Sequence, residues 1–125
     1  MLETKLFLAI EKELDQIVQL AEKCITETNA ASTNMEEAQF RNFQNLAAAT
    51  DSVLVLENFI AYQIGRKKVD ASVGRRILQD MESLDQKARE ICRQQPEEIL
   101  RRLRMELVRL YLGFLVRKFI AERKS

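Results

Sequence analysis

Only three glycines and one proline interrupt this chain of 125 residues. Sheets and long loops normally use more of both residues as turn signals, so their scarcity favours long helices joined by short turns. Runs of β-branched residues with the two-residue period of a strand are also missing. Apolar residues make up 46% of the chain and charged residues 31%, a balance typical of a folded chain rather than a disordered one. The sequence therefore predicts an all-α protein.

Apolar residues recur at the three- and four-residue spacing of a helix along most of the chain. This periodicity predicts five helices, at about residues 2–28, 35–49, 53–65, 71–94 and 96–122. The length suits one domain with a modest core. We expect a single domain over residues 1–125, folded as a compact bundle of about five helices with a long hydrophobic C-terminal helix.

Start and stop signals separate these helices. Asn34 and Asp70 are candidate N-caps, as is the polar segment 50–52. Pro96 suits the first position of the last helix, because a proline there loses no helical hydrogen bond. Gly65 can adopt the left-handed conformation that ends a helix. These signals place the predicted turns.

The chain lacks the groups that most enzymes use. It contains no histidine, which is the commonest general base near neutral pH and the commonest ligand of transition metals. It has no glycine-rich phosphate loop, and no Ser, Cys or Thr stands in the sequence context of a nucleophile. The adjacent carboxylate pairs 36–37 and 97–98 lie in first turns of predicted helices, where the helix dipole favours them. We expect no enzymatic activity, no cofactor and no metal site.

Several features predict a cytoplasmic protein with no membrane partner. Cys24 and Cys92 lie far apart on apolar helical stripes and form no CxxC pair, so we expect two buried thiols in a reducing compartment. Charged residues alternate with spaced apolar ones at the start of the chain, which is not typical of a signal peptide. The most apolar stretch, residues 105–120, is too short and too charged to span a hydrocarbon layer about 30 Å thick.

The charges are divided unequally along the chain. Residues 1–65 contain 4 Lys+Arg against 10 Asp+Glu, a net of −6, whereas residues 66–125 contain 16 against 9, a net of +7. The net charge of the whole chain is only +1, although residues 66–125 are strongly basic. A concentrated positive field is typical of proteins whose partner is a polyanion such as RNA, DNA or an anionic membrane.

The densest group of cations lies within residues 66–76, where Asp70 is the single acid, and a second group lies within residues 101–104. Recognition of backbone phosphates needs Arg and Lys without fixed spacing, because it reads charge rather than base identity. Aromatic residues are few and have the spacing of core residues, so contact with a duplex backbone is favoured over stacking on single strands. The candidate nucleic-acid-binding residues are Arg41, Arg66, Lys67, Lys68, Arg75, Arg76, Arg101, Arg102 and Arg104.

Two short segments, residues 39–43 (Gln-Phe-Arg-Asn-Phe) and residues 61–66 (Ala-Tyr-Gln-Ile-Gly-Arg), resemble the small subunit of CRISPR effector complexes. In the type III version of that family, a Gln-apolar-Arg-polar-aromatic segment precedes a helix that ends in Ala-Tyr-x-x-Gly-Arg. The long last helix, with its Arg and Lys residues, is similar to the C-terminal helical domain of a type I-D large subunit. That domain is sometimes produced separately as a small subunit.

The resemblance implies a non-catalytic small subunit of a Cascade-like or type III RNA-guided surveillance complex in antiviral defence. Such a subunit braces the duplex of guide RNA and target, and the displaced strand, through phosphate contacts. Its protein partners are neighbouring copies of itself and the backbone and large subunits of the complex. Arg41 and Arg66 are the positions that match the family.

Two other hypotheses stay open. One is a helical adaptor that does not bind nucleic acid, in which the acidic half of one copy meets the basic half of another. The other is a helix that lies on a membrane surface, using the last segment of the chain. The second hypothesis is weaker, because the basic residues of that segment are not segregated onto one face.

Overall fold

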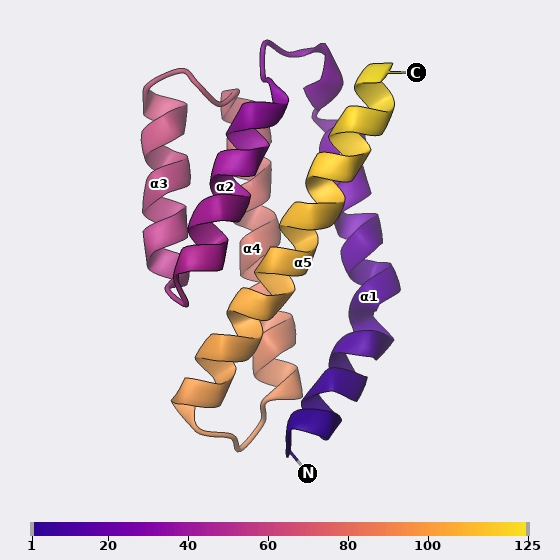
Figure 1. Cartoon of the computed structure of the whole chain (residues 1–125), viewed down its shortest axis with the longest axis vertical. Helices are drawn as coiled ribbons and strands as arrows, with labels where there is room; N and C mark the ends of the chain where they lie inside the picture. Colours follow the sequence, from indigo (N-terminus) through magenta and orange to yellow (C-terminus); the bar gives the residue numbers. More distant parts are fainter. Residues whose placement is uncertain (1, 125) are drawn as a thin grey trace.

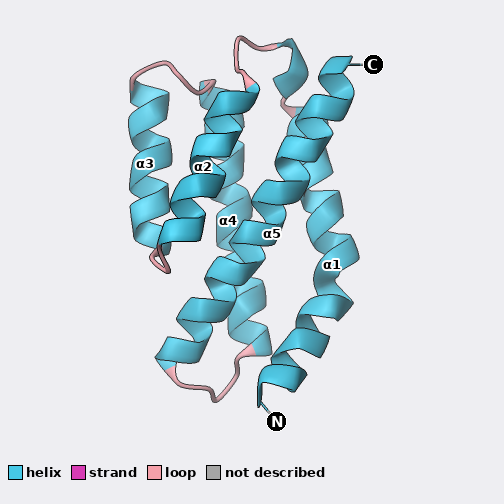
Figure 2. Ribbon diagram, viewed as in Figure 1, coloured by secondary structure: helices cyan, strands magenta, loops and turns pink. Residues whose placement is uncertain are grey.

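The computed structural model describes residues 2–124, and these residues form helices and turns without any strand (Figure 2). The elements in chain order are α1 (Leu2–Glu27), the 3₁₀ turn η1 (Ala30–Ser32), α2 (Glu37–Ala49), α3 (Val53–Gly65), α4 (Ala71–Ile91) and α5 (Glu97–Lys124). The prediction of an all-α bundle of about five helices is confirmed. The turn η1 lies in a segment that the sequence predicted as a loop.

Successive α-helices run in alternating directions, so that α1, α3 and α5 point one way and α2 and α4 the other (Figure 1). Helix α5 crosses the middle of the bundle and packs against α1, α2 and α4. Helix α3 forms one edge of the bundle, and its main contacts are with α2 and α4. Helix α1 forms the opposite edge.

The core is centred on α5. Its buried residues include Leu107, Val108, Tyr111, Leu112, Leu115, Val116 and Phe119. They cover more than one side of the helix, because α1, α2 and α4 all pack against it. The predicted length of this helix is confirmed, but its hydrophobic character is not. Charged residues occupy its solvent side along its whole length, from Glu97 to Lys124.

Two of the predicted helix caps are confirmed. The Ser52 hydroxyl accepts the N–H of Val55 at 3.2 Å, and the Asp70 carboxylate accepts the N–H of Val73 at 3.1 Å. Each side chain therefore satisfies a donor that the first turn of a helix would leave without a partner. Cys24 and Cys92 are free thiols and are buried, as the sequence predicted.

Three boundary predictions are wrong. Asn34 does not cap α2; Glu36 occupies that position and forms a capping box with Gln39, whose side-chain oxygen accepts the Glu36 N–H at 2.6 Å. Helix α5 begins one residue after Pro96. No glycine in the described residues has a positive φ, and the left-handed residue after α3 is Lys67 rather than Gly65.

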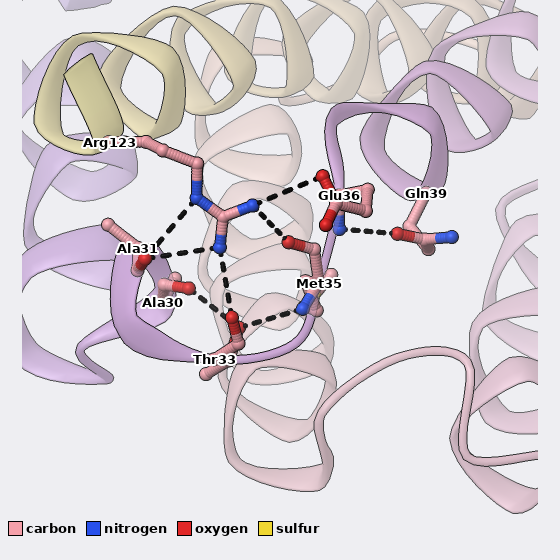
Figure 3. A network of polar contacts seen from close by, with 7 residues as sticks. All are labelled: Ala30, Ala31, Thr33, Met35, Glu36, Gln39 and Arg123. Carbon is pink, nitrogen blue, oxygen red and sulfur yellow. Dashed lines mark hydrogen bonds and ion pairs between the residues drawn. The ribbon is translucent and has the colours of Figure 1, made fainter.

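Arg123 holds the connection between α1 and α2 (Figure 3). Its guanidinium donates hydrogen bonds to the backbone carbonyls of Ala31 at 3.1 Å, Thr33 at 2.9 Å and Met35. The same group lies 4.4 Å from the ring centroid of Phe119. One side chain near the end of α5 therefore satisfies three carbonyls of a turn that is distant in the sequence.

Replacing Arg123 with lysine is expected to lower the free energy of unfolding by about 1–3 kcal/mol, because a single ammonium cannot donate to three separated carbonyls. Lys124→Ala is the matched control, since Lys124 is exposed and should change stability by less than about 0.5 kcal/mol. Urea denaturation followed by circular dichroism measures both variants. Equal effects at the two positions would contradict the role assigned to Arg123.

Candidate nucleic-acid interface

The connection between α3 and α4 brings four of the candidate cations to one end of the bundle (Figure 1). Arg66, Lys67 and Lys68 follow the last turn of α3, and Arg75 lies near the start of α4. All four residues are exposed, and none of them forms an ion pair with a carboxylate of residues 2–124. We call these four residues the α3–α4 cation cluster.

A glycine allows α3 and α4 to approach closely beside this cluster. A Cβ atom at Gly74 would lie 2.5 Å from Cδ1 of Ile64, a distance at which the side chain of Ile64 must move. The buried side chain of Val69 fills the turn between the two helices and lies 3.2 Å from the same position. This close packing holds the start of α4, and with it Arg75, near the end of α3.

Lys67 adopts a left-handed backbone conformation with φ 62°. Its N–H donates to the carbonyl of Ile64 at 3.0 Å, and the N–H groups of Lys68 and Val69 both donate to the carbonyl of Gln63. These bonds close the end of α3. A left-handed conformation costs a residue other than glycine about 1–2 kcal/mol.

Polar groups of the α1–α2 connection stand beside the two lysines of the cluster. Lys67 and Lys68 line an open depression of about 520 Å³ together with Ser32, Thr33 and Asn34. Hydroxyl and amide groups are common partners of phosphate oxygens, as are lysines. The single carboxylate of the segment, Asp70, also lines the depression but is already used as the cap of α4. The depression therefore offers several donors close to an excess of positive charge.

Arg76, the next residue after the cluster, is directed into the fold. Its Nη1 lies 2.8 Å from a carboxylate oxygen of Glu27, and its Nε lies 3.2 Å from Oδ1 of Asp80. Tyr111 donates to Oδ2 of Asp80 at 2.6 Å. The network joins α1, α4 and α5 around a carboxylate that is 3% exposed. The structure thus places Arg76 in an internal role and separates it from the four exposed cations.

Burial shifts the titration of this network. It raises the pKa of Asp80 above its ordinary value, although the hydrogen bond from Tyr111 and the charge of Arg76 oppose the shift. It raises the pKa of Tyr111 well above its usual range and the pKa of Cys24 to about 12. The Cys24 thiol is therefore neutral and unreactive at physiological pH.

The raised pKa of Asp80 predicts a pH-dependent contribution to stability. Because the folded state holds this proton more tightly than the unfolded state, the contribution of Asp80 to stability is present at low pH and is lost as the pH rises through the folded pKa. Asp80→Asn removes that contribution. The free energy of unfolding of the wild type minus that of the variant should therefore grow as the pH falls from 7 toward 4, by about 1.4 kcal/mol for each unit by which the pKa is raised. Urea denaturation at several pH values measures this, and a difference independent of pH would contradict it.

The second group of candidate cations lies at the other end of α4, near the start of α5 (Figure 1). Arg101 is exposed and its Nε approaches the carbonyl of Asp51 at 3.5 Å. Arg102 is exposed and has no ion pair among the described residues. Arg104 is mostly buried and pairs with Asp85 at 2.9 Å. Since α4 is about 30 Å long, the two groups form separate surfaces.

Arg41 lies on α2, apart from both groups. Its side chain is 50% exposed and its Nε lies 3.1 Å from a carboxylate oxygen of Glu37, four residues earlier. It also donates to the side chain of Gln44 at 3.3 Å. Exposed pairs with this spacing contribute only about 0.3–0.5 kcal/mol, so a phosphate can displace Glu37 at small cost.

Helix α3 also exposes large apolar residues that were not among the predicted site residues. Leu54 is 76% exposed, Tyr62 is 55% exposed and Val55 is 47% exposed. The guanidinium of Arg66 lies 5.3 Å from the ring centroid of Tyr62. The sequence did contain a signal for an exposed apolar surface. Val53–Gly65 has a single charged residue, Glu57, and is more apolar than a helix with one buried face needs to be.

No protein-family model, curated protein or solved structure matches this chain. Within residues 2–124, no group of three or more His, Cys, Asp or Glu side chains is arranged to hold a metal ion. None of the helices described combines the length and the apolar character needed to cross a bilayer.

Proposed function

We propose that this chain is a non-catalytic small subunit of a CRISPR RNA-guided surveillance complex, and that it braces the duplex of guide RNA and target through phosphate contacts. The observation that carries the proposal is the α3–α4 cation cluster. Its four members are exposed and lack carboxylate partners in the described chain, and two of them, Lys67 and Lys68, line a polar depression.

The chemistry of this cluster suits a phosphate backbone better than bases. Lysine and arginine neutralise phosphates and release condensed counterions, a contribution that does not depend on sequence. A duplex carries one negative charge for about every 1.7 Å of its axis, so several neighbouring cations can each find a phosphate. Ser32 and Asn34 add uncharged donors that can position the backbone.

The two segments that resemble the CRISPR small subunit support the same proposal. Residues 61–65 form the end of α3, and Arg66, which follows them, is the first member of the cation cluster. Residues 39–43 lie on α2, where Phe40 and Phe43 are buried and Arg41 is exposed. In both segments the arginine that matches the family is on the surface, where it can reach a partner. Neighbouring copies and the large and backbone subunits are the protein partners that this proposal implies.

Removing three cations of the cluster tests the proposal. The variant Lys67→Gly/Lys68→Ala/Arg75→Ala loses three charges, and glycine relieves the left-handed conformation at residue 67 instead of straining it. Affinity for a short RNA–DNA heteroduplex is measured by fluorescence anisotropy over a series of salt concentrations. The slope of log K against log salt should become shallower by about 2–3, and the weakening should be the same for different sequences.

The matched control is Arg93→Ala/Arg117→Ala/Lys124→Ala, which removes three other exposed cations. Both triple variants have the same net charge, so only the position of the lost charges differs. The control should keep the salt slope of the wild type. If both variants weaken binding equally, or if neither does, the α3–α4 cation cluster is not the phosphate-binding surface.

A helical adaptor that does not bind nucleic acid is the second candidate function. The exposed Leu54 and Tyr62 favour it, because apolar residues gathered on a surface often mark a protein interface. The same titration separates the two functions. Wild-type protein with no salt-dependent affinity for the heteroduplex would support the adaptor and overturn the phosphate-binding proposal.

A further inference from the structure

Tyr62 is an exposed aromatic residue next to the α3–α4 cation cluster. It is 55% exposed, on a helix that forms one edge of the bundle (Figure 1). The guanidinium of Arg66, one helical turn later, lies 5.3 Å from the centroid of its ring. The two residues are also joined through the backbone, because the Arg66 N–H donates to the Tyr62 carbonyl at 3.0 Å. The end of α3 therefore holds an exposed ring beside the first cation of the cluster.

No carboxylate of α3 lies beside Tyr62 on the surface of the helix. Residues three and four positions away are neighbours on a helix surface, and for Tyr62 these are Asn58, Phe59, Gly65 and Arg66. The single acid of α3, Glu57, is five positions earlier, so it is turned about 140° away around the helix axis. A phosphate chain can therefore approach the ring without repulsion from this helix.

The other exposed aromatic residue of the described chain has the opposite surroundings. Phe7 on α1 is 65% exposed. Glu3 and Glu11 lie one helical turn before and after it, and both are exposed. Carboxylates at these positions repel phosphates, whereas Arg66 attracts them. Tyr62 is thus the exposed ring whose neighbours suit a nucleic acid, and Phe7 is a natural comparison for it.

A nucleobase can replace Arg66 on the ring of Tyr62. An exposed cation–π contact strengthens an interaction about 2- to 5-fold, whereas the stacking of a base on an aromatic side chain strengthens binding about 5- to 150-fold. A base is therefore expected to displace the guanidinium. Arg66 has no ion pair among the described residues, so it is then free to neutralise a phosphate. Paired bases inside a duplex are already stacked on one another, so only an unpaired base can offer its face to the ring.

We propose that Tyr62 and Arg66 form a subsite for an unpaired nucleotide, whose base stacks on Tyr62 and whose phosphate pairs with Arg66. Lys67, Lys68 and Arg75 hold the backbone of the adjoining duplex, so this inference rests on the proposed function and adds the kind of nucleic acid that the surface selects. That ligand is a junction between duplex and single strand rather than a uniform duplex. The sequence favoured contact with a duplex backbone alone, because its aromatic residues have the spacing of core residues, but Tyr62 lies outside the core.

Three nucleic acids separate the stacking of a base from contact with phosphates. The first is a blunt RNA–DNA heteroduplex, and the second is the same duplex with a single-stranded overhang of three nucleotides. The third carries an overhang of three abasic nucleotides, which has the same phosphates and no bases. Fluorescence anisotropy at one fixed salt concentration measures the affinity for each. Wild-type protein should bind the overhang with bases at least about 5-fold more tightly than the abasic overhang.

Substitutions at Tyr62 test the role of the ring. Tyr62→Ala should bind the two overhangs equally, while its affinity for the blunt heteroduplex and the salt dependence of that affinity stay those of the wild type. Tyr62→Phe keeps an aromatic face and should keep the preference. Phe7→Ala, the matched control, removes the other exposed ring and should also keep it.

A fluorescent base reports stacking directly. With 2-aminopurine in the overhang, binding of the wild type or of Tyr62→Phe should quench the fluorescence of the base, because a stacked base loses its excited state to its neighbour. Binding of Tyr62→Ala should leave the fluorescence unchanged. This second measurement compares bound states, so it does not depend on small differences in affinity.

Several results would overturn the inference. Binding of the blunt heteroduplex without any preference for the overhang with bases removes the nucleotide subsite and leaves the proposed function standing. A preference that survives Tyr62→Ala, or that is lost equally in Phe7→Ala, assigns the stacking to the wrong residue. Equal weakening of all three nucleic acids by Tyr62→Ala indicates a structural role for the ring. A wild type that binds none of the three overturns the proposed function and the subsite together.

Discussion

A buried carboxylate on α4 constrains the arrangement of the whole bundle. Asp80 is 3% exposed, and an ionised carboxylate at such a site is costly unless charge and hydrogen bonds compensate it. Arg76 supplies the charge and Tyr111 supplies a hydrogen bond at 2.6 Å. Because Tyr111 belongs to α5 and Arg76 also binds Glu27 of α1, satisfying this one group fixes three helices relative to one another.

The need to satisfy polar groups inside the fold divides the basic residues into two populations. Arg76, Arg104 and Arg123 are directed inward and satisfy carboxylates or backbone carbonyls. Arg109 belongs with them, because it donates to the carbonyls of Ala47 and Thr50 at the end of α2. Arginine suits these positions since its planar group donates to several acceptors at once. The second population consists of the exposed basic residues in the second half of the chain. Only these exposed residues can contact a partner.

Local signals in the sequence predicted much of the fold. Helical periodicity located all five α-helices, and Ser52 and Asp70 were recognisable as caps because a cap depends on residues only a few positions away. The left-handed turn at Lys67 was missed, because packing of Val69 between α3 and α4 determines where that chain reverses. The role of Arg123 could not be predicted, since its acceptors lie about ninety positions earlier in the chain.

The candidate site was predicted only in part. The concentration of cations in residues 66–75 is visible in the sequence, and their binding of nucleic acid stays a prediction. Arg76 was grouped with them, although Asp80 four residues later was a signal for an internal pair. The helix predicted at residues 71–94 already separated the groups at 66–75 and 101–104, and the structure places them at opposite ends of α4. Which cations face outward depends on tertiary packing.

The division of the basic residues can be observed directly by nuclear magnetic resonance. A short RNA–DNA heteroduplex is titrated into the labelled protein, and backbone amides and arginine Nε–Hε signals are followed together. We expect the amides of residues 66–75 to shift while the Nε–Hε signals of Arg76, Arg104 and Arg123 do not. Shifts at these three arginines without any at residues 66–75 would contradict it.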